Sequence, residues 1–168
     1  SNPTIFEKAI NGSHDYDAPL SQLARAGLTV DEIYEALVID DIRRATDLFR
    51  PLFRASDGLD GYVSLEVSPK LANETQQTLE EARRLWAKVD RANVMIKVPA
   101  TPAGIPAIEQ LISEGINVNV TLMFSIEHYV RVAEAYVRGL QTRAQNGQPL
   151  AVASVASFFV SRVDSLID

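Results

Sequence analysis

Short apolar segments alternate with longer amphipathic segments along most of the chain. Four segments have the length and the β-branched content of strands, at 61–67, 93–98, 116–122 and 150–157. Between them, apolar residues recur at helical spacing near 71–90, 103–114 and 125–146. Strand–helix–strand alternation is typical of parallel sheets with right-handed crossovers. The sequence therefore predicts an α/β protein with four parallel strands.

The first third of the chain has a different pattern. A helical region is predicted from about 15 to 54, with breaks at Gly27 and Pro51, and residues 1–6 are predicted to form a loop. The final segment, SFFVSRVDSLID, is predicted to open another helix. Helical spacing predicts one core-facing side for the long region: Ile33, Leu37, Ile42, Ala45, Leu48 and Phe49.

Each of the first three predicted strands has one β-branched face and one face with polar side chains. In the first strand, Ser64 and Glu66 oppose Val63, Leu65 and Val67. Polar residues gather toward the carboxyl ends of the four strands: Glu66, Lys97, Asn119, Thr121 and Ser157.

This gathering is the arrangement expected at the site of a (β/α)8 TIM barrel. A doubly wound sheet also binds ligands beyond the carboxyl ends of its strands, and it remains the alternative. A complete barrel takes about 250 residues, so the 168 residues here predict one partial barrel domain, 1–168, truncated at both ends.

Lys97 lies in an otherwise apolar run, NVMIKVP. Burial disfavours the charged form of an amine, and a neutral lysine amine is a nucleophile toward carbonyl carbons. The alternatives are a lysine that faces solvent from an edge strand and one half of a structural ion pair.

Glu66 is predicted to lie beside Lys97 because adjacent strands are about 4.8 Å apart. With a bound water, a carboxyl group can move the protons that imine formation requires; otherwise Glu66 only neutralises Lys97. Asn119 and Thr121 are equally compatible with polar side chains that satisfy one another in a barrel interior. Arg162, in the first turn of the last helix, suits an anion or is a surface arginine.

Composition excludes several classes of protein. The net charge of −6 argues against nucleic acid as the main partner. Without cysteine there is no disulfide or thiolate chemistry, which is compatible with the cytoplasm. With two histidines, a histidine-rich metal site is not expected, and no apolar stretch approaches the roughly 20 residues of a membrane span.

Five segments, in order, resemble transaldolase in its longer bacterial form, which also occurs fused to a phosphoglucose isomerase. They are SNPTIF, DGYVSLEVSP, NVMIKVPAT, EGINVNVTLMFS and SVASFFVSR, and the resemblance covers essentially the whole chain. It implies the following roles: Lys97 as the Schiff-base lysine, Glu66 as the carboxylate that activates the catalytic water, and Thr121 as a residue that helps to hold that water. It also implies substrate contacts by Asn2, Asn119 and Ser157, phosphate binding by Arg162 and a pocket-shaping role for Phe159.

The resemblance further implies transfer of a dihydroxyacetone unit from a ketose phosphate to an aldose phosphate, in the pentose phosphate pathway. No metal or organic cofactor is expected, and a homo-oligomer is possible. The family's acid/base aspartate, a second phosphate-binding arginine and its neighbouring serine have no counterpart in this chain. The alternatives are a fructose 6-phosphate aldolase and a catalytically inert half-barrel.

Overall fold

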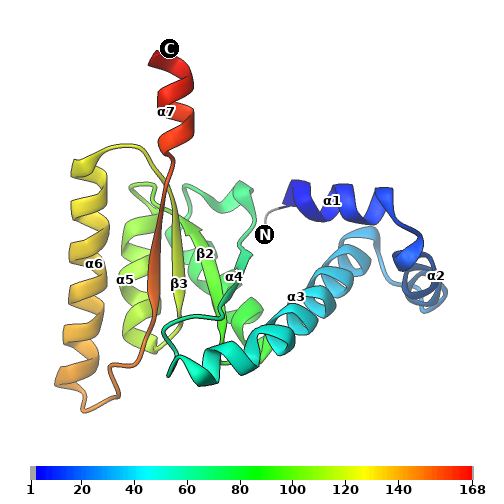
Figure 1. Ribbon diagram of the computed structural model, residues 1–168, viewed down its shortest axis with the longest axis horizontal. Coiled ribbons are helices and arrows are strands. Elements are labelled where there is room, and N and C mark those ends of the chain that lie inside the picture. Colours follow the sequence, from blue (N-terminus) through cyan, green and yellow to red (C-terminus); the bar gives the residue numbers. More distant parts are fainter. Residues whose placement is uncertain (1–2, 168) are drawn as a thin grey trace.

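Four parallel strands form a single sheet in the computed structural model, which describes residues 3–167. The strands are β1 (Val63–Glu66), β2 (Val94–Pro99), β3 (Val118–Met123) and β4 (Ser154–Phe158). Their order in the sheet is β1-β2-β3-β4, so neighbours in sequence are neighbours in space (Figure 1). A doubly wound sheet reverses its strand order at a switch point, and this sheet has none. The prediction of a partial (β/α)8 barrel is confirmed.

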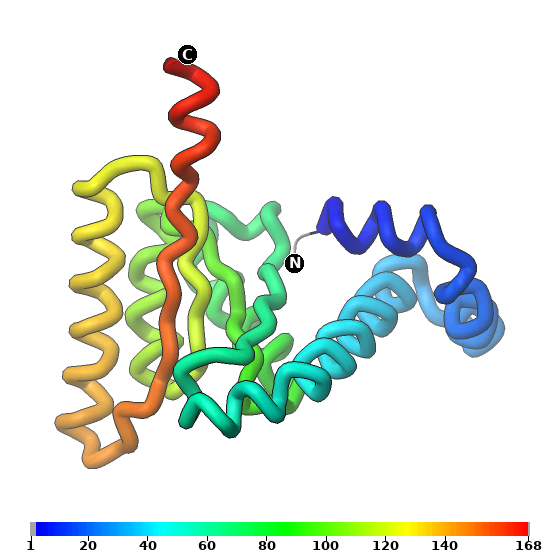
Figure 2. Tube along the Cα trace, viewed as in Figure 1, coloured from blue at the N-terminus to red at the C-terminus, as the bar shows by residue number. Residues whose placement is uncertain are grey.

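Three helices cover one face of this sheet: α4 (Thr75–Val89), α5 (Gly104–Glu114) and α6 (Ile126–Gln145). Figure 2 shows the three running alongside the strands on that face. The core between the two layers contains the predicted β-branched strand residues, among them Val94, Ile96, Val98, Val118 and Val120. The opposite face therefore carries the polar side chains, as the alternation predicted.

The backbone of β3 departs from simple alternation near its end. Leu122 has a φ of 64°, and the pairing with β4 shifts between Val120 and Met123. A bulge of this kind reverses the side-chain alternation. Met123, rather than the predicted Leu122, consequently points into the core and is fully buried.

The chain before β1 forms helices: α1 (Pro3–Gly12), the short 3-10 helix η1 (His14–Tyr16), α2 (Asp17–Arg25) and α3 (Val30–Ala55). The predicted loop at 1–6 is wrong for residues 3–6, which open α1. Pro3 is the first residue of this helix, a position that favours proline because its missing N–H has no helical partner there. Figure 1 shows α1 and α2 extending to the side of the sheet.

The predicted break at Gly27 is confirmed, but the break at Pro51 is wrong. Helix α3 continues through Pro51 and ends at Ala55. Proline removes one helical hydrogen bond, and because Pro51 is exposed and near the helix end, water can satisfy the freed carbonyl.

The core face predicted for α3 is wrong at two positions. Leu48 is 80% exposed and Phe49 is 49% exposed. The buried face runs through Val38, Ile39, Ile42 and Thr46, and Leu48 lies on the opposite side of the helix from Thr46. Thr46 can be buried because its hydroxyl donates to the carbonyls of Ile42 and Arg43.

Two further elements flank the sheet. The 3-10 helix η2 (Pro69–Leu71) follows β1, and the predicted last helix is present as α7 (Val160–Ile167), which extends from the carboxyl end of β4 (Figure 1). Within residues 3–167, no helix is both long enough and apolar enough to cross a membrane.

Candidate active site

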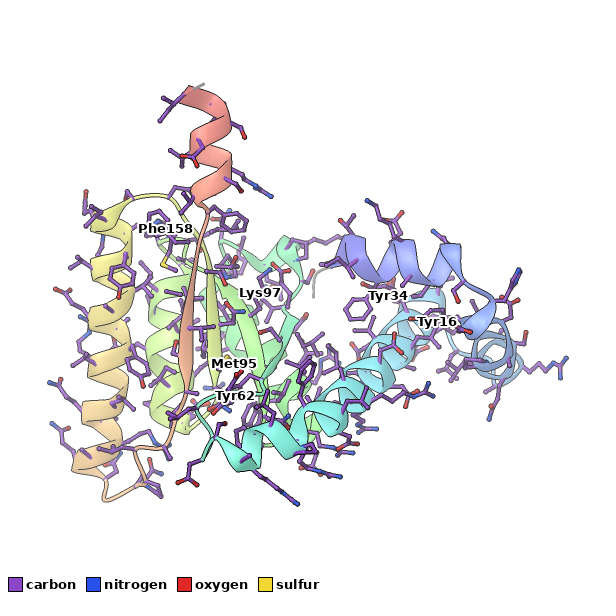
Figure 3. The ribbon with its side chains drawn as sticks, in the orientation of Figure 1. Tyr16, Tyr34, Tyr62, Met95, Lys97 and Phe158 are labelled. Atoms are coloured by element: carbon purple, nitrogen blue, oxygen red, sulfur yellow. The ribbon has the colours of Figure 1, made fainter. Side chains whose placement is uncertain are left out.

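Lys97 and Glu66 form an ion pair across the two strands that carry them. They are opposite one another in the register of β1 and β2, and Lys97 Nζ lies 3.2 Å from Glu66 Oε2. The two side chains are 16% and 18% exposed. Because β2 lies between β1 and β3, Lys97 is not an edge-strand residue. Figure 3 shows Lys97 beyond Met95 along β2, nearer to the end of the sheet from which α7 emerges.

Asn119 connects the strands on both sides of Lys97. Its amide Nδ2 donates to Ser64 Oγ at 2.9 Å, and its Oδ1 accepts from Ser157 Oγ at 2.8 Å. The three side chains belong to β3, β1 and β4. The structure thus brings the predicted residues Asn119 and Ser157 together with Lys97, which is opposite Asn119 in the β2–β3 register.

Ser64 also belongs to this polar cluster, although it is not among the predicted site residues. Strand alternation puts Ser64 on the same face as Glu66, and that shared face is the signal by which it could have been found. The hydrogen bond to Asn119 passes over β2, although β1 and β3 in a flat sheet are roughly 10 Å apart. The polar face must therefore be concave, as the interior of a barrel is.

Thr121 is buried next to this cluster, at the end of β3. It is 1% exposed and lies opposite Pro99 in the β2–β3 register. Its Oγ1 is the one buried side-chain nitrogen or oxygen among residues 3–167 without a hydrogen-bond partner. Buried hydroxyls are normally paired with protein or with ordered water. This atom is therefore available to hold a small polar ligand such as water.

Arg162 and Phe159 lie where β4 passes into α7. The Arg162 guanidinium carbon is 4.7 Å from the centroid of the Phe159 ring. That ring stacks in turn on Phe124, with centroids 5.6 Å apart and planes inclined by 23°. Phe124, like Ser64, was not predicted; an aromatic residue directly after a strand that carries Asn119 and Thr121 was the only signal. Asn2 lies outside the described residues.

The cluster has the groups that imine chemistry requires: a largely desolvated amine, a carboxylate in contact with it, and amide and hydroxyl groups beside them. Among residues 3–167, no set of three or more His, Cys, Asp or Glu side chains is placed to hold a metal ion. These groups lie at the carboxyl ends of parallel strands, the end at which barrel enzymes carry their active sites, and they are the kinds of group that a covalent lysine site needs.

Comparison with known proteins assigns the family. Residues 1–168 match the model of the Transaldolase/Fructose-6-phosphate aldolase family. The chain belongs to this family.

Relatives of known name agree with that assignment. The chain is 56% identical to Transaldolase 2 of Nostoc punctiforme over 98% of its own length and 44% of the relative's. It is 53% identical to the transaldolase of Trichodesmium erythraeum and 50% identical to that of Mycobacterium ulcerans, in both cases over 100% of its length. These two alignments cover 44% and 45% of the relatives, so the chain spans less than half the length of the curated relatives it matches.

Proposed function

We propose that the full-length protein containing this chain is a transaldolase that works through a Schiff base on Lys97. The observation that carries the proposal is the 3.2 Å pair of Lys97 and Glu66, on neighbouring strands of a barrel wall. Its substrates are sugar phosphates: a ketose phosphate donor such as sedoheptulose 7-phosphate or fructose 6-phosphate, and an aldose phosphate acceptor such as glyceraldehyde 3-phosphate or erythrose 4-phosphate. The reaction belongs to the pentose phosphate pathway in the cytoplasm.

Imine formation begins when the neutral Lys97 amine attacks the C2 carbonyl carbon of the ketose. The carbonyl oxygen takes up a proton and the nitrogen loses one, which gives the neutral carbinolamine. Its hydroxyl then takes up a second proton and leaves as water, and a protonated imine remains. In this proposal Glu66 exchanges these protons with Lys97, directly or through a water molecule; the contact between the two side chains supports that role. The unpartnered Thr121 hydroxyl supplies a second hydrogen-bonding group for that water.

Carbon–carbon cleavage uses the imine as an electron sink. The pair of electrons from the C3–C4 bond moves toward the iminium nitrogen, the C4 hydroxyl loses its proton, and an aldose phosphate leaves. The dihydroxyacetone unit stays on Lys97 until it adds to the carbonyl carbon of the acceptor. None of the residues described here is assigned as the base for the C4 hydroxyl.

The remaining polar residues position the substrate. Asn119 and Ser157 lie beside Lys97 and hold one another through their hydrogen bond, so their remaining polar positions can meet sugar hydroxyls. Asn2 is proposed to make a similar contact. Arg162, at the start of α7, is proposed to bind the phosphate, with Phe159 shaping the wall of the pocket.

Chemical trapping tests the proposal. Full-length protein is incubated with fructose 6-phosphate and borohydride, which reduces the imine to a stable secondary amine, and the labelled peptide is identified by mass spectrometry. The adduct is expected on Lys97, and Lys97→Ala should abolish it, whereas the exposed Lys70→Ala should not. An adduct on another lysine would show that the central assignment is wrong.

The family name also covers fructose 6-phosphate aldolase, which releases free dihydroxyacetone instead of transferring it. Measurement of product with and without an aldose phosphate acceptor separates the two activities. Turnover of a transaldolase depends on the acceptor, and acceptor-independent release of dihydroxyacetone would favour the aldolase.

A further inference from the structure

Three side chains from different segments form one continuous stack at the carboxyl end of the sheet. Phe124 lies against Phe159, and the guanidinium of Arg162 lies on the Phe159 ring. Arg162 and Phe159 have roles in the proposed reaction, whereas Phe124 has none. Its side chain is 44% exposed.

The backbone on both sides of Phe124 is fixed. The preceding residue, Met123, is fully buried, and its carbonyl accepts a hydrogen bond from the Phe159 backbone N–H at 3.1 Å. The following residue, Ser125, caps α6 by accepting from the His128 N–H. Phe124 is therefore attached to the rigid junction of β3 and α6.

Arg162 has no comparable support from its own element. It lies in the first turn of α7, none of whose residues is buried. Within residues 3–167 no carboxylate lies within ion-pair distance of Arg162, and its guanidinium lies on the face of the Phe159 ring. A guanidinium resting on an aromatic face keeps its N–H groups free at its edge, where they can meet an anion.

We propose that Phe124 is a positioning residue for the anion-binding guanidinium, acting through the Phe159 ring. The inference rests on the proposed function because it takes Arg162 as the phosphate contact. Phe124 fixes the plane of Phe159 by stacking, and that plane sets the height and orientation of Arg162. The ligand class concerned is the phosphate group of the sugar phosphate, not the carbonyl end that reacts with Lys97.

The proposal is tested in the full-length protein with Phe124→Leu, which keeps an apolar side chain but removes the ring. Aromatic stacking and cation–π contacts at such sites change affinity by roughly 3- to 10-fold. KM for fructose 6-phosphate should rise by that factor while kcat changes less than twofold. The kcat/KM for unphosphorylated fructose should stay unchanged. Phe124→Tyr, which retains the ring, should restore the wild-type KM.

A matched control is Phe53→Leu. Phe53 makes an edge-to-face pair with Tyr62, with ring centroids 5.2 Å apart, near the start of β1 and away from the carboxyl ends of the strands. Its loss should leave both KM values unchanged, so a general loss of aromatic packing can be separated from an effect on Arg162.

Calorimetric titration with inorganic phosphate distinguishes failure of this inference from failure of the proposed function, because it requires no turnover. Weaker phosphate binding in Phe124→Leu than in wild type or Phe124→Tyr supports the inference even if no Lys97 adduct forms. Equal phosphate affinity in all three proteins, or equal loss of kcat/KM for phosphorylated and unphosphorylated sugars, overturns it.

Discussion

Asn119 and Ser64 share a 2.9 Å hydrogen bond that crosses over β2, although their strands are not adjacent. The bond lies at the level of Met95 and Lys97, which are opposite Ser64 and Asn119 in the two registers. It fixes the Asn119 amide beside the lysine, and it leaves the amide one further N–H with which to bind a ligand. The concave curvature of the barrel wall is what makes this contact possible.

Ser64→Ala tests whether that bond matters for the reaction. A hydrogen bond of this kind contributes about 1 kcal/mol, so kcat/KM for fructose 6-phosphate should fall roughly fivefold. In the Asn119→Ala background the same change should have almost no further effect, because the partner is already absent. Ser154→Ala, which removes a strand hydroxyl that donates only to the Val118 carbonyl, is the control. Additive losses in the double variant would contradict a role through Asn119.

The ion pair of Lys97 and Glu66 should also be visible in folding stability. Lys97→Met keeps most of the side-chain volume but leaves the largely buried Glu66 without its cation. Breaking such a pair on one side is destabilising, and with this degree of exposure a loss of roughly 1–3 kcal/mol is expected in urea unfolding. The double variant Glu66→Gln/Lys97→Met should recover most of the loss. Wild-type stability in Lys97→Met would show that the pair contributes little to the folded state.

Gly104 is required at the start of α5 because the helix comes very close to the end of β2. A Cβ at this position would lie 2.0 Å from the Pro99 carbonyl oxygen, a backbone atom that cannot move without shifting the strand. Gly104→Ala should cost about 2–4 kcal/mol of unfolding free energy. Gly12→Ala has no atom within 4 Å of the new Cβ, so no loss, or a gain of about 0.5 kcal/mol, is expected there. Equal thermal midpoints for the two variants would refute this explanation.

The strands could be predicted because both signals on which they depend are local. Val94, Ile96 and Val98 occupy every second position of one short run, so they share one face of the strand, and Lys97 lies on the other face. The burial of all three follows from that spacing. The positions that failed depend on contacts that are distant in sequence. Leu48 has the same helical spacing as core residues, but which side of α3 meets β1 is decided by the whole sheet.

The candidate site also contains residues that could be predicted from local sequence and residues that could not. Glu66, Lys97, Asn119 and Ser157 could be grouped from sequence because parallel strands bring their carboxyl ends to one edge. Ser64 could not be selected, since its bond to Asn119 requires the curvature of a barrel wall, which strand alternation does not specify. Phe124 was missed because its stacking partner, Phe159, lies beyond an intervening helix and strand.

Glu35 couples the stability of the protein to pH through contacts between α3 and α4. Arg84 Nη1 lies 2.6 Å from Glu35 Oε1, and Lys88 donates to the same oxygen. The hydrogen bond from Arg84, with a further contribution from Lys88, lowers the pKa of Glu35 from 4.5 to about 2. Because the unfolded chain binds this proton more readily, the pair stabilises the fold above about pH 4.5, and that stabilisation is lost as pH falls toward 2.

Glu35→Gln should therefore have a lower urea midpoint than wild type at pH 7, and the difference between the two midpoints should shrink steadily as the pH is lowered into the acid range. Glu127→Gln, which removes an exposed pair with Arg131, should match wild type throughout. A Glu35→Gln difference that is the same at pH 7 and in acid would show that the carboxylate's charge is not the cause.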